Sequence, residues 1–135
     1  MKHIRSIVGA SLLAIGLTAC FRTVNSVEVG SSVDGQYRWI QTDSGMSQIA
    51  AVVSAKKVRV NDLLKVQVEV KNLRPIQERF YSKFEWLDND GMLVDTPLST
   101  WEPRIIPGNE VIMIQGIAPH PGVTDCRLKL QESSR

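Results

Sequence analysis

The sequence lacks the short motifs that carry the best-known enzyme chemistries. It has no Gly-rich phosphate loop, no Gly-x-Ser-x-Gly nucleophile elbow, and no paired carboxylates flanked by a run that would form a cleft. Histidine and cysteine are scarce, with two of each among the 135 residues. We therefore predict that the chain is not an enzyme and that it binds no cofactor.

Long hydrophobic runs are absent except near the N-terminus. Residues 1–5 carry Lys2 and Arg5 and no acid, and residues 7–19 are almost wholly apolar or small. This order is typical of a secretory signal peptide. A membrane-spanning helix needs about 20 apolar residues, so the run is too short to span a bilayer. We expect residues 1–19 to be cleaved off.

The signal ends in Leu17-Thr18-Ala19-Cys20, which closely resembles the lipobox of bacterial lipoproteins. The resemblance implies that the signal is cut before Cys20, that its thiol is diacylated, and that the acylated Cys20 holds the chain in membrane lipid. Each buried methylene adds about 0.8 kcal/mol, so two or three acyl chains make the attachment effectively permanent. Phe21 follows Cys20 in place of Asp, which by enterobacterial sorting implies the outer membrane, with the domain facing the periplasm. The alternative is an ordinary secretory signal with a coincidental cysteine.

An excess of charge of either sign is also absent once the signal is removed. The mature chain has 135 − 19 = 116 residues, with 16 − 2 = 14 basic and 14 acidic side chains. A neutral domain lacks the broad basic field that nucleic-acid binding requires. We therefore expect no nucleic-acid partner.

The two remaining candidate ligands do not make a convincing site. Cys126 alternates in phase with Leu128 and Leu130, which predicts a buried small hydrophobic residue instead of a reactive thiol. His120 lies between two prolines and is the only histidine left after cleavage, whereas zinc needs several His or Cys ligands. A set of Cys126, His120 and Asp125 is opposed by the strand phase, which turns the cysteine inward. We predict no metal site.

Beyond residue 47 the pattern favours short strands. Leu64 to Val70 alternates apolar with charged or amide residues, which indicates a strand with one buried face. Phe80, Phe84 and Trp86 share one face of another strand, whose bulk marks it as central. Further strands are expected at residues 49–53, 58–60, 92–94, 111–117 and 124–131, with 111–117 buried on both sides and 97–108 forming a long connection or a pair of edge segments.

These strands predict an all-β, mainly β chain: an immunoglobulin-like antiparallel β-sandwich of about six to seven strands. The predicted organisation is a signal peptide at 1–19, the lipidated cysteine and a flexible tether or lead-in at 20–47, and the sandwich domain at 48–135. The oligomeric state is left open, although an exposed edge strand such as Ile49–Val53 could pair with a second copy.

Asp88-Asn89-Asp90-Gly91 is a candidate calcium loop, but the EF-hand spacing fails. With Gly91 at the sharp-turn position, the first ligand falls on Trp86, which has no oxygen in its side chain. A hairpin turn with solvated acids is the favoured interpretation, because these residue types suit a left-handed turn. A looser calcium site stays open as an alternative.

Scaffold residues point to a family. Several segments together resemble the YcfL-like envelope lipoproteins of Gram-negative bacteria. They are Asn61 to Val68, Asn72, Tyr81 to Asp88 with Gly91, and Trp101 with Ala118-Pro119. The resemblance covers about residues 48–131 and the lipobox. It implies a β-sandwich fold and an envelope location, and it transfers no catalytic residue.

The remaining candidates are binding residues. Arg74, Trp101, Arg104 and His120 lie in loops that combine rigid prolines with aromatic or basic groups, a surface typical of partner recognition. Trp101 could instead cap the core, and the basic group at 56–59 is expected to be a solvated face. We predict a non-enzymatic accessory lipoprotein that binds an envelope protein; the alternative is a small-ligand or metal-binding β-sandwich module.

Overall fold

A computed structural model describes residues 25–28, 38–40 and 44–133. The predicted signal peptide, the lipobox and Cys20 lie outside these residues. In the part of the chain that the model describes, no helix is long and apolar enough to cross a membrane.

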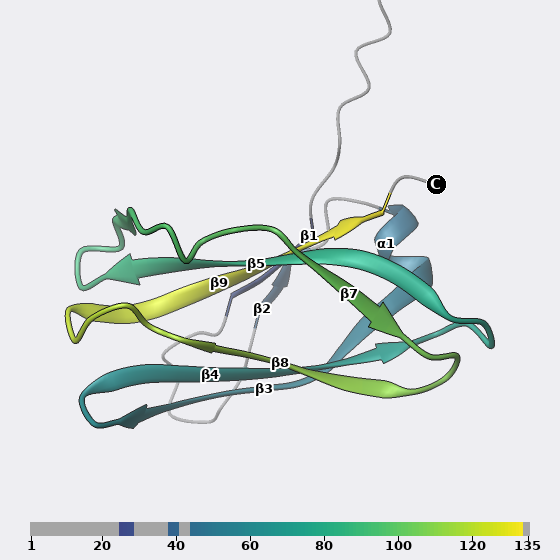
Figure 1. The fold of residues 1–135 in the computed structure, drawn as a ribbon, viewed down its shortest axis with the longest axis horizontal. Coiled ribbons are helices and arrows are strands. Elements are labelled where there is room, and N and C mark those ends of the chain that lie inside the picture. Colours follow the sequence, from purple (N-terminus) through teal and green to yellow (C-terminus); the bar gives the residue numbers. More distant parts are fainter. Residues whose placement is uncertain (1–24, 29–37, 41–43, 134–135) are drawn as a thin grey trace, which may run out of the picture.

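The chain forms two antiparallel sheets that face each other (Figure 1). One sheet has six strands in the order β2-β1-β9-β5-β6, with β7 also paired to β5, and the other has three in the order β3-β4-β8. The predicted β-sandwich is thereby confirmed. The elements are β1 (Asn25–Glu28), β2 (Arg38–Ile40), α1 (Ser44–Ile49), β3 (Ala50–Val60), β4 (Leu63–Asn72), β5 (Glu78–Asp88), β6 (Leu93–Val94), β7 (Glu102–Ile106), β8 (Val111–Ile117) and β9 (Val123–Glu132).

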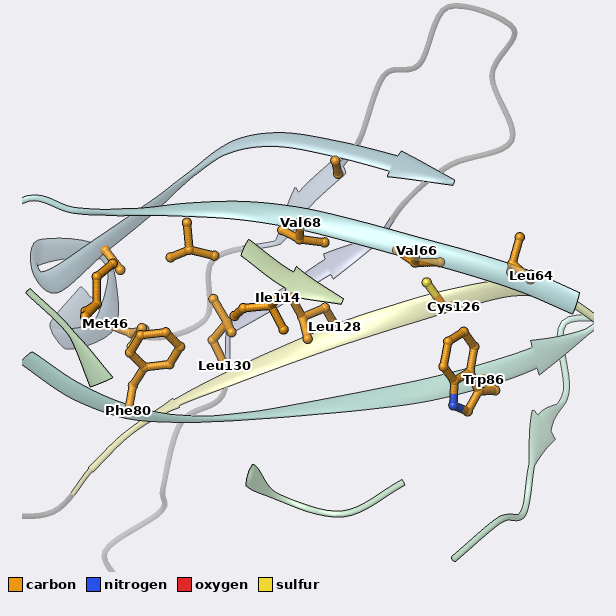
Figure 2. Packing of buried hydrophobic residues seen from close by; sticks show 14 of the residues in the cluster. Met46, Leu64, Val66, Val68, Phe80, Trp86, Ile114, Cys126, Leu128 and Leu130 are labelled. Atoms are coloured by element: carbon orange, nitrogen blue, oxygen red, sulfur yellow. The ribbon is translucent and has the colours of Figure 1, made fainter. Parts of the chain in front are cut away.

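The core lies between the two sheets and follows from alternation along β4, β5 and β9. Even-numbered residues of β4 from Leu64 to Val70 are buried, and Cys126, Leu128 and Leu130 of β9 meet them from the other sheet (Figure 2). Phe80 and Trp86 point inward from β5, which lies between β9 and the short strands β6 and β7, as predicted for a central strand. Apolar area removed from water contributes about 25 cal/mol per Å², so this layer is the main source of stability.

The N-terminal elements add to this core from within residues 20–47, the segment interpreted as tether and lead-in. β1 pairs with β9, and β2 pairs with β1. Ile49 was expected to begin a strand but is the last residue of α1, which buries Met46 and Ile49. Strand β3 runs continuously through the predicted segments 49–53 and 58–60, from Ala50 to Val60, and has a bulge between Val52 and Ser54.

The prediction that residues 111–117 are buried on both sides is wrong. β8 is an edge strand of the three-stranded sheet, and Val111, Met113 and Ile117 are exposed on its outer face. Only Ile114 of this strand is fully buried. A continuous apolar run is typical of a doubly covered strand, but here nothing among the described residues covers the outer face of β8.

Each end of the sandwich gathers several turns (Figure 1). We call one the Asn72 end, with the turns at 73–77 and 107–110, and the other the His120 end, with the turns at 61–62, 89–92 and 118–122. At the His120 end, Asn61 and Asp62 both have positive φ, the geometry of a two-residue hairpin. Gly91 has φ of 75° in the predicted hairpin between β5 and β6, which is confirmed.

One buried amide joins the two turns of the Asn72 end. The Asn72 side chain is fully buried, and its Nδ2 lies 2.8 Å from the carbonyl oxygen of Ile76, in one turn, and 3.0 Å from that of Pro107, in the other. Its Oδ1 accepts a hydrogen bond of 2.9 Å from the backbone N–H of Arg74. The turns also touch directly, because a Cβ on Gly108 would lie 2.2 Å from the carbonyl oxygen of Pro75.

Candidate functional site

The outer face of the six-stranded sheet carries the most elaborate group of polar side chains in the described part of the molecule. Lys83 is opposite Lys129 in the register between β5 and β9, and Glu85 is opposite Arg127. These residues alternate with buried ones, so their side chains point away from the core. The face is therefore a charged layer over the two central strands.

Glu85 is the centre of this layer. Its carboxylate lies 2.8 Å from Lys129 Nζ, 3.4 Å from Lys83 Nζ and 3.9 Å from an Arg127 nitrogen. The residue is only 8% exposed because these side chains cover it. Burial by itself would raise the pKa of Glu85. The hydrogen bond and charge of Lys129, together with those of Lys83, lower it by more, so the net pKa lies below its usual value. Glu85 therefore stays ionised and fixes the two lysines.

Trp101 lies at the edge of the same face, just before β7. The Nζ of Lys83 is 5.0 Å from the centre of its ring, a cation–π contact. The tryptophan is 36% exposed and does not belong to the buried core cluster. We call this surface the Trp101 face. It comprises Tyr81, Lys83, Glu85, Trp101, Arg127 and Lys129.

Arg104 does not share the Trp101 face. It lies opposite Phe80 in the register between β7 and β5, and its Nε donates a hydrogen bond of 2.9 Å to Ser82 Oγ. Both of those β5 residues point into the sandwich. Arg104 therefore lies on the other side of β7 from Trp101, where it also pairs with Glu102.

Arg74 and His120 occupy opposite ends of the molecule. Arg74 follows β4 at the Asn72 end, where its Nη1 lies 2.7 Å from Glu78 Oε1 as an ion pair. His120 follows β8 in an exposed turn, where its Nδ1 accepts a hydrogen bond of 3.1 Å from the backbone N–H of Gly122. The four residues predicted to bind a partner thus lie in four different places, and only Trp101 contributes to the charged face.

Comparison with known proteins decides the family. A family model described as a protein of unknown function, DUF1425, matches residues 36–132. This chain belongs to the DUF1425 family.

Solved structures agree with this DUF1425 assignment at the level of fold. A DUF1425 member from Shewanella sp. PV-4 has 20% sequence identity and a TM-score of 0.60, over 77% of this chain and 94% of that one. The structure of Cj0090 from Campylobacter jejuni has 21% identity and a TM-score of 0.55, over 61% of this chain and 85% of that one. No curated protein matches.

The Asp88 turn of this DUF1425 domain is closed by its own side chain. Asp88 Oδ1 accepts hydrogen bonds of 2.9 Å from the backbone N–H groups of both Asp90 and Met92. With these two bonds, the Asp88 carboxylate holds the turn in shape. A hollow of about 300 Å³ lies beside the turn, but the described residues contain no group of three or more His, Cys, Asp or Glu residues able to hold a metal.

Cys126 of the DUF1425 core is buried, as predicted. Burial, with the nearby charge of Asp125, raises the pKa of its thiol to about 12, so the reactive thiolate is not formed at neutral pH. Asp125 pairs with Lys57 at 3.3 Å. The geometry gives no support to a Cys126, His120 and Asp125 set, because the cysteine is enclosed whereas the histidine is exposed.

The basic group at residues 56–59 has a more structural role than the solvated face expected for it. Lys57 reaches Asp125 of β9, and Arg59 Nη2 donates a hydrogen bond of 3.0 Å to the carbonyl oxygen of Val123. Two of the three basic side chains therefore bridge the two sheets of the DUF1425 sandwich.

Sequence reasoning missed Lys129 and Arg127 as members of the Trp101 face. The signal was present, because Arg127 and Lys129 alternate with buried residues just as Lys83 and Glu85 do. What alternation alone does not give is the pairing of β5 with β9 in this register. That register brings the two lysines to one carboxylate.

Proposed function

We propose that this DUF1425 chain is a lipid-anchored accessory lipoprotein that binds an envelope protein and catalyses no reaction. The basic and apolar N-terminal residues followed by Leu17-Thr18-Ala19-Cys20 support the anchor. The likeness of the scaffold residues to YcfL-like lipoproteins supports an envelope location. In this proposal, acylated Cys20 attaches the chain to the outer membrane, and the sandwich faces the periplasm.

The observation that carries the binding proposal is the exposed ring of Trp101 beside Lys83 on an ordered sheet face. Tryptophan is among the residues that contribute most to protein interfaces, because its large ring removes much apolar area from water at little cost in conformational entropy. Trp101 immediately precedes β7, whose pairing with β5 begins at Glu102, so a partner meets a side chain next to an ordered strand.

The charges of the face suggest the chemistry of the partner. Lys83 and Lys129 share the carboxylate of Glu85. Because one carboxylate faces two ammonium groups, an acidic side chain on the partner can pair with Lys83 while an apolar group covers Trp101. We therefore infer a protein partner that presents an acidic residue beside an apolar or aromatic one.

Crosslinking in cells tests this proposal. The tagged full-length chain, treated with a short crosslinker, is compared with Trp101→Ala and with the matched control Leu98→Ala, which truncates another exposed apolar side chain outside the face. We expect one envelope protein to be captured by the parent chain and by Leu98→Ala, with recovery at least about tenfold lower for Trp101→Ala.

The anchor is tested in the same cells with Cys20→Ala. We expect this variant to lose labelling by palmitate and to leave the membrane fraction. Equal capture by Trp101→Ala and Leu98→Ala would remove Trp101 from the interface, and failure to capture any specific protein would contradict the binding function itself.

A further inference from the structure

β8 is an uncharged strand at the edge of the three-stranded sheet. From Val111 to Ile117 it contains no charged residue and no proline. Met113, near its middle, is 60% exposed, and Val111 and Ile117 are exposed beside it on the same face. Among the described residues, β8 pairs with β4 on one side and with no strand on the other.

The free side of β8 carries a full set of backbone hydrogen-bonding groups. Just outside the strand, the Glu110 carbonyl accepts from the Asn72 N–H at 2.8 Å, and the Ala118 N–H donates to the Leu64 carbonyl at 2.8 Å. In an antiparallel ladder, residues whose N–H and C=O groups face the partner alternate with residues whose groups face away. The even-numbered residues of β8 therefore bond to β4, and the N–H and C=O groups of the odd-numbered residues from Val111 to Ile117 point outward.

The opposite edge of the same sheet is protected against strand addition. β3 has a bulge between Val52 and Ser54, which bends the edge away from a regular ladder. Near its end, Lys57 points inward to Asp125 of the other sheet, and the exposed Arg59 bonds across to the carbonyl oxygen of Val123. Bulges and inward charges are devices that stop one sheet from pairing with another.

The β7 edge is protected as well. Pro103 lies in the middle of β7 and has no N–H to donate, and Arg104 beside it points inward to Ser82. β8 has a Met, a Gln and aliphatic residues in place of such devices. Of these three edges, β8 alone is a regular and unprotected template for another strand.

We propose that β8 pairs with β8 of a second copy of this chain, antiparallel and centred on Ile114, so that two three-stranded sheets become one continuous sheet. In this register Val111 lies opposite Ile117 of the second copy, and Met113 lies opposite Gln115 of the second copy. All four residues have outward backbone groups, so each such pair exchanges two N–H···O bonds.

The strand is its own complement in this arrangement. A two-fold axis requires the same surface to fit itself, and an antiparallel pair of uncharged strands brings no like charges together. The pairing also gives the exposed Val111, Met113 and Ile117 apolar or amide neighbours across the seam. A second copy therefore satisfies both the backbone groups and the exposed side chains. The proposal does not depend on the lipid anchor or on the Trp101 face.

Disulfide trapping in the full-length chain tests the pairing and its register. Directly opposed residues that exchange hydrogen bonds have Cα atoms about 5.5 Å apart, which suits a disulfide. We therefore expect the double variant Met113→Cys/Gln115→Cys to form a covalent dimer under mild oxidation. The matched control Lys56→Cys/Val58→Cys places two cysteines at the same spacing on the outer face of β3. It should form no covalent dimer under the same oxidation, and neither should the parent chain with its own cysteines.

A charge on the strand tests the pairing without oxidation. Met113→Lys should weaken self-association of the full-length chain by at least about tenfold in sedimentation, because it places two ammonium groups near the seam. Val58→Lys adds the same charge to the protected edge and should leave the association unchanged. Met113 is exposed and its backbone groups face away from β4, so at a concentration where the parent is monomeric both variants should keep the parent unfolding temperature.

Three results would overturn the proposal. These are a parent chain that stays monomeric up to about 100 μM, equal trapping by the β3 and β8 cysteine pairs, and a β8 cysteine pair that is captured by a different protein instead of by a second copy. None of these results bears on the Trp101 variants, so the two proposals fail separately.

Discussion

The two ends of the sandwich hold their turns in different ways. At the Asn72 end, one buried side chain bonds to the turn at 73–77 and to the turn at 107–110. At the His120 end, Asp88 and His120 each bond to backbone groups within their own turn, and the link across turns comes from the exposed Arg59. The turns of the first end therefore depend on one another, whereas those of the second can change one at a time. The four predictions below test this difference, from the largest expected effect to the smallest.

The largest effect is expected from Asn72→Ala. The substitution removes the donor to partly buried carbonyl oxygens at both turns and to the buried carbonyl oxygen of Ile106. A buried acceptor left without a donor costs about 1–3 kcal/mol. We expect the free energy of unfolding to fall by about 3 kcal/mol, measured by urea denaturation. Asn89→Ala, at an exposed asparagine of the other end, serves as the control and should change it by less than about 0.5 kcal/mol. A loss below about 1 kcal/mol for Asn72→Ala would show that the two turns do not depend on the amide.

The same substitution at two glycines compares the ends directly. In Gly108→Ala the new Cβ meets backbone atoms of Pro75 at 2.2 and 2.4 Å, whereas in Gly122→Ala it meets only the His120 ring, at 3.1 Å. Backbone cannot move aside cheaply, but an exposed imidazole can. We expect Gly108→Ala to lower the unfolding free energy by about 2 kcal/mol and Gly122→Ala by less than about 1 kcal/mol. Equal losses in thermal denaturation would contradict the comparison.

The pH dependence separates the Asn72 end from the charged Trp101 face. Asn72 has no ionisable group, so its contribution should not vary with pH. The folded-state pKa of Glu85 lies below its ordinary value of 4.5, because Lys129 and Lys83 outweigh the opposing effect of burial. Since the folded state holds this proton less tightly than the unfolded state, the stability from Glu85 is full above pH 4.5 and is lost as the pH falls through the lower folded-state pKa.

Glu85→Gln should therefore be less stable than the parent by about 1 kcal/mol near neutral pH, and the difference should shrink towards about pH 3. Urea denaturation at a series of pH values measures this. Lys129→Gln removes the main group that lowers the Glu85 pKa, so the stability of this variant should also depend less on pH than that of the parent. A constant difference between parent and Glu85→Gln at all pH values would contradict the assignment.

The smallest effect is expected from His120→Ala. The imidazole is exposed and its hydrogen bond to the Gly122 N–H stays within one turn, so water can replace it. We expect a change within about 0.5 kcal/mol in urea denaturation. A loss comparable with that of Asn72→Ala would mean that this turn, too, supports its neighbours.

Strand positions were predictable because alternation is local. The pattern of Leu64 to Val70 predicts both the strand and its buried face without any knowledge of the neighbouring strands, and the structure confirms it. The position of β8 at an edge was not predictable, because the apolar pattern of one strand does not show which strands pair with it or whether another layer covers its outer face. The bulge in β3 was not predictable for a related reason, since it is defined only by the pairing of β3 with β4.

The candidate site was less predictable than the fold. Trp101 was selected because a loop that combines prolines with aromatic and basic groups suggests a surface for binding, and its role stays a prediction. Glu85 and Lys129 were not linked in advance, since they are far apart in the sequence and only the register of β5 with β9 brings them within 2.8 Å. Arg104 was assigned to the surface on its charge, whereas its place in the register turns it towards Ser82.

The enclosed thiol of Cys126 is a built-in probe for the opening of the folded chain. A thiol with a pKa of about 12 reacts with an alkylating reagent only when β9 separates from the facing strand β4 and water reaches it. Labelling therefore proceeds only from molecules whose two layers are apart, and its rate in intact cells reports the fraction of time that the two sheets spend apart. That open state can thus be followed in place, without purification and without adding a probe to the chain.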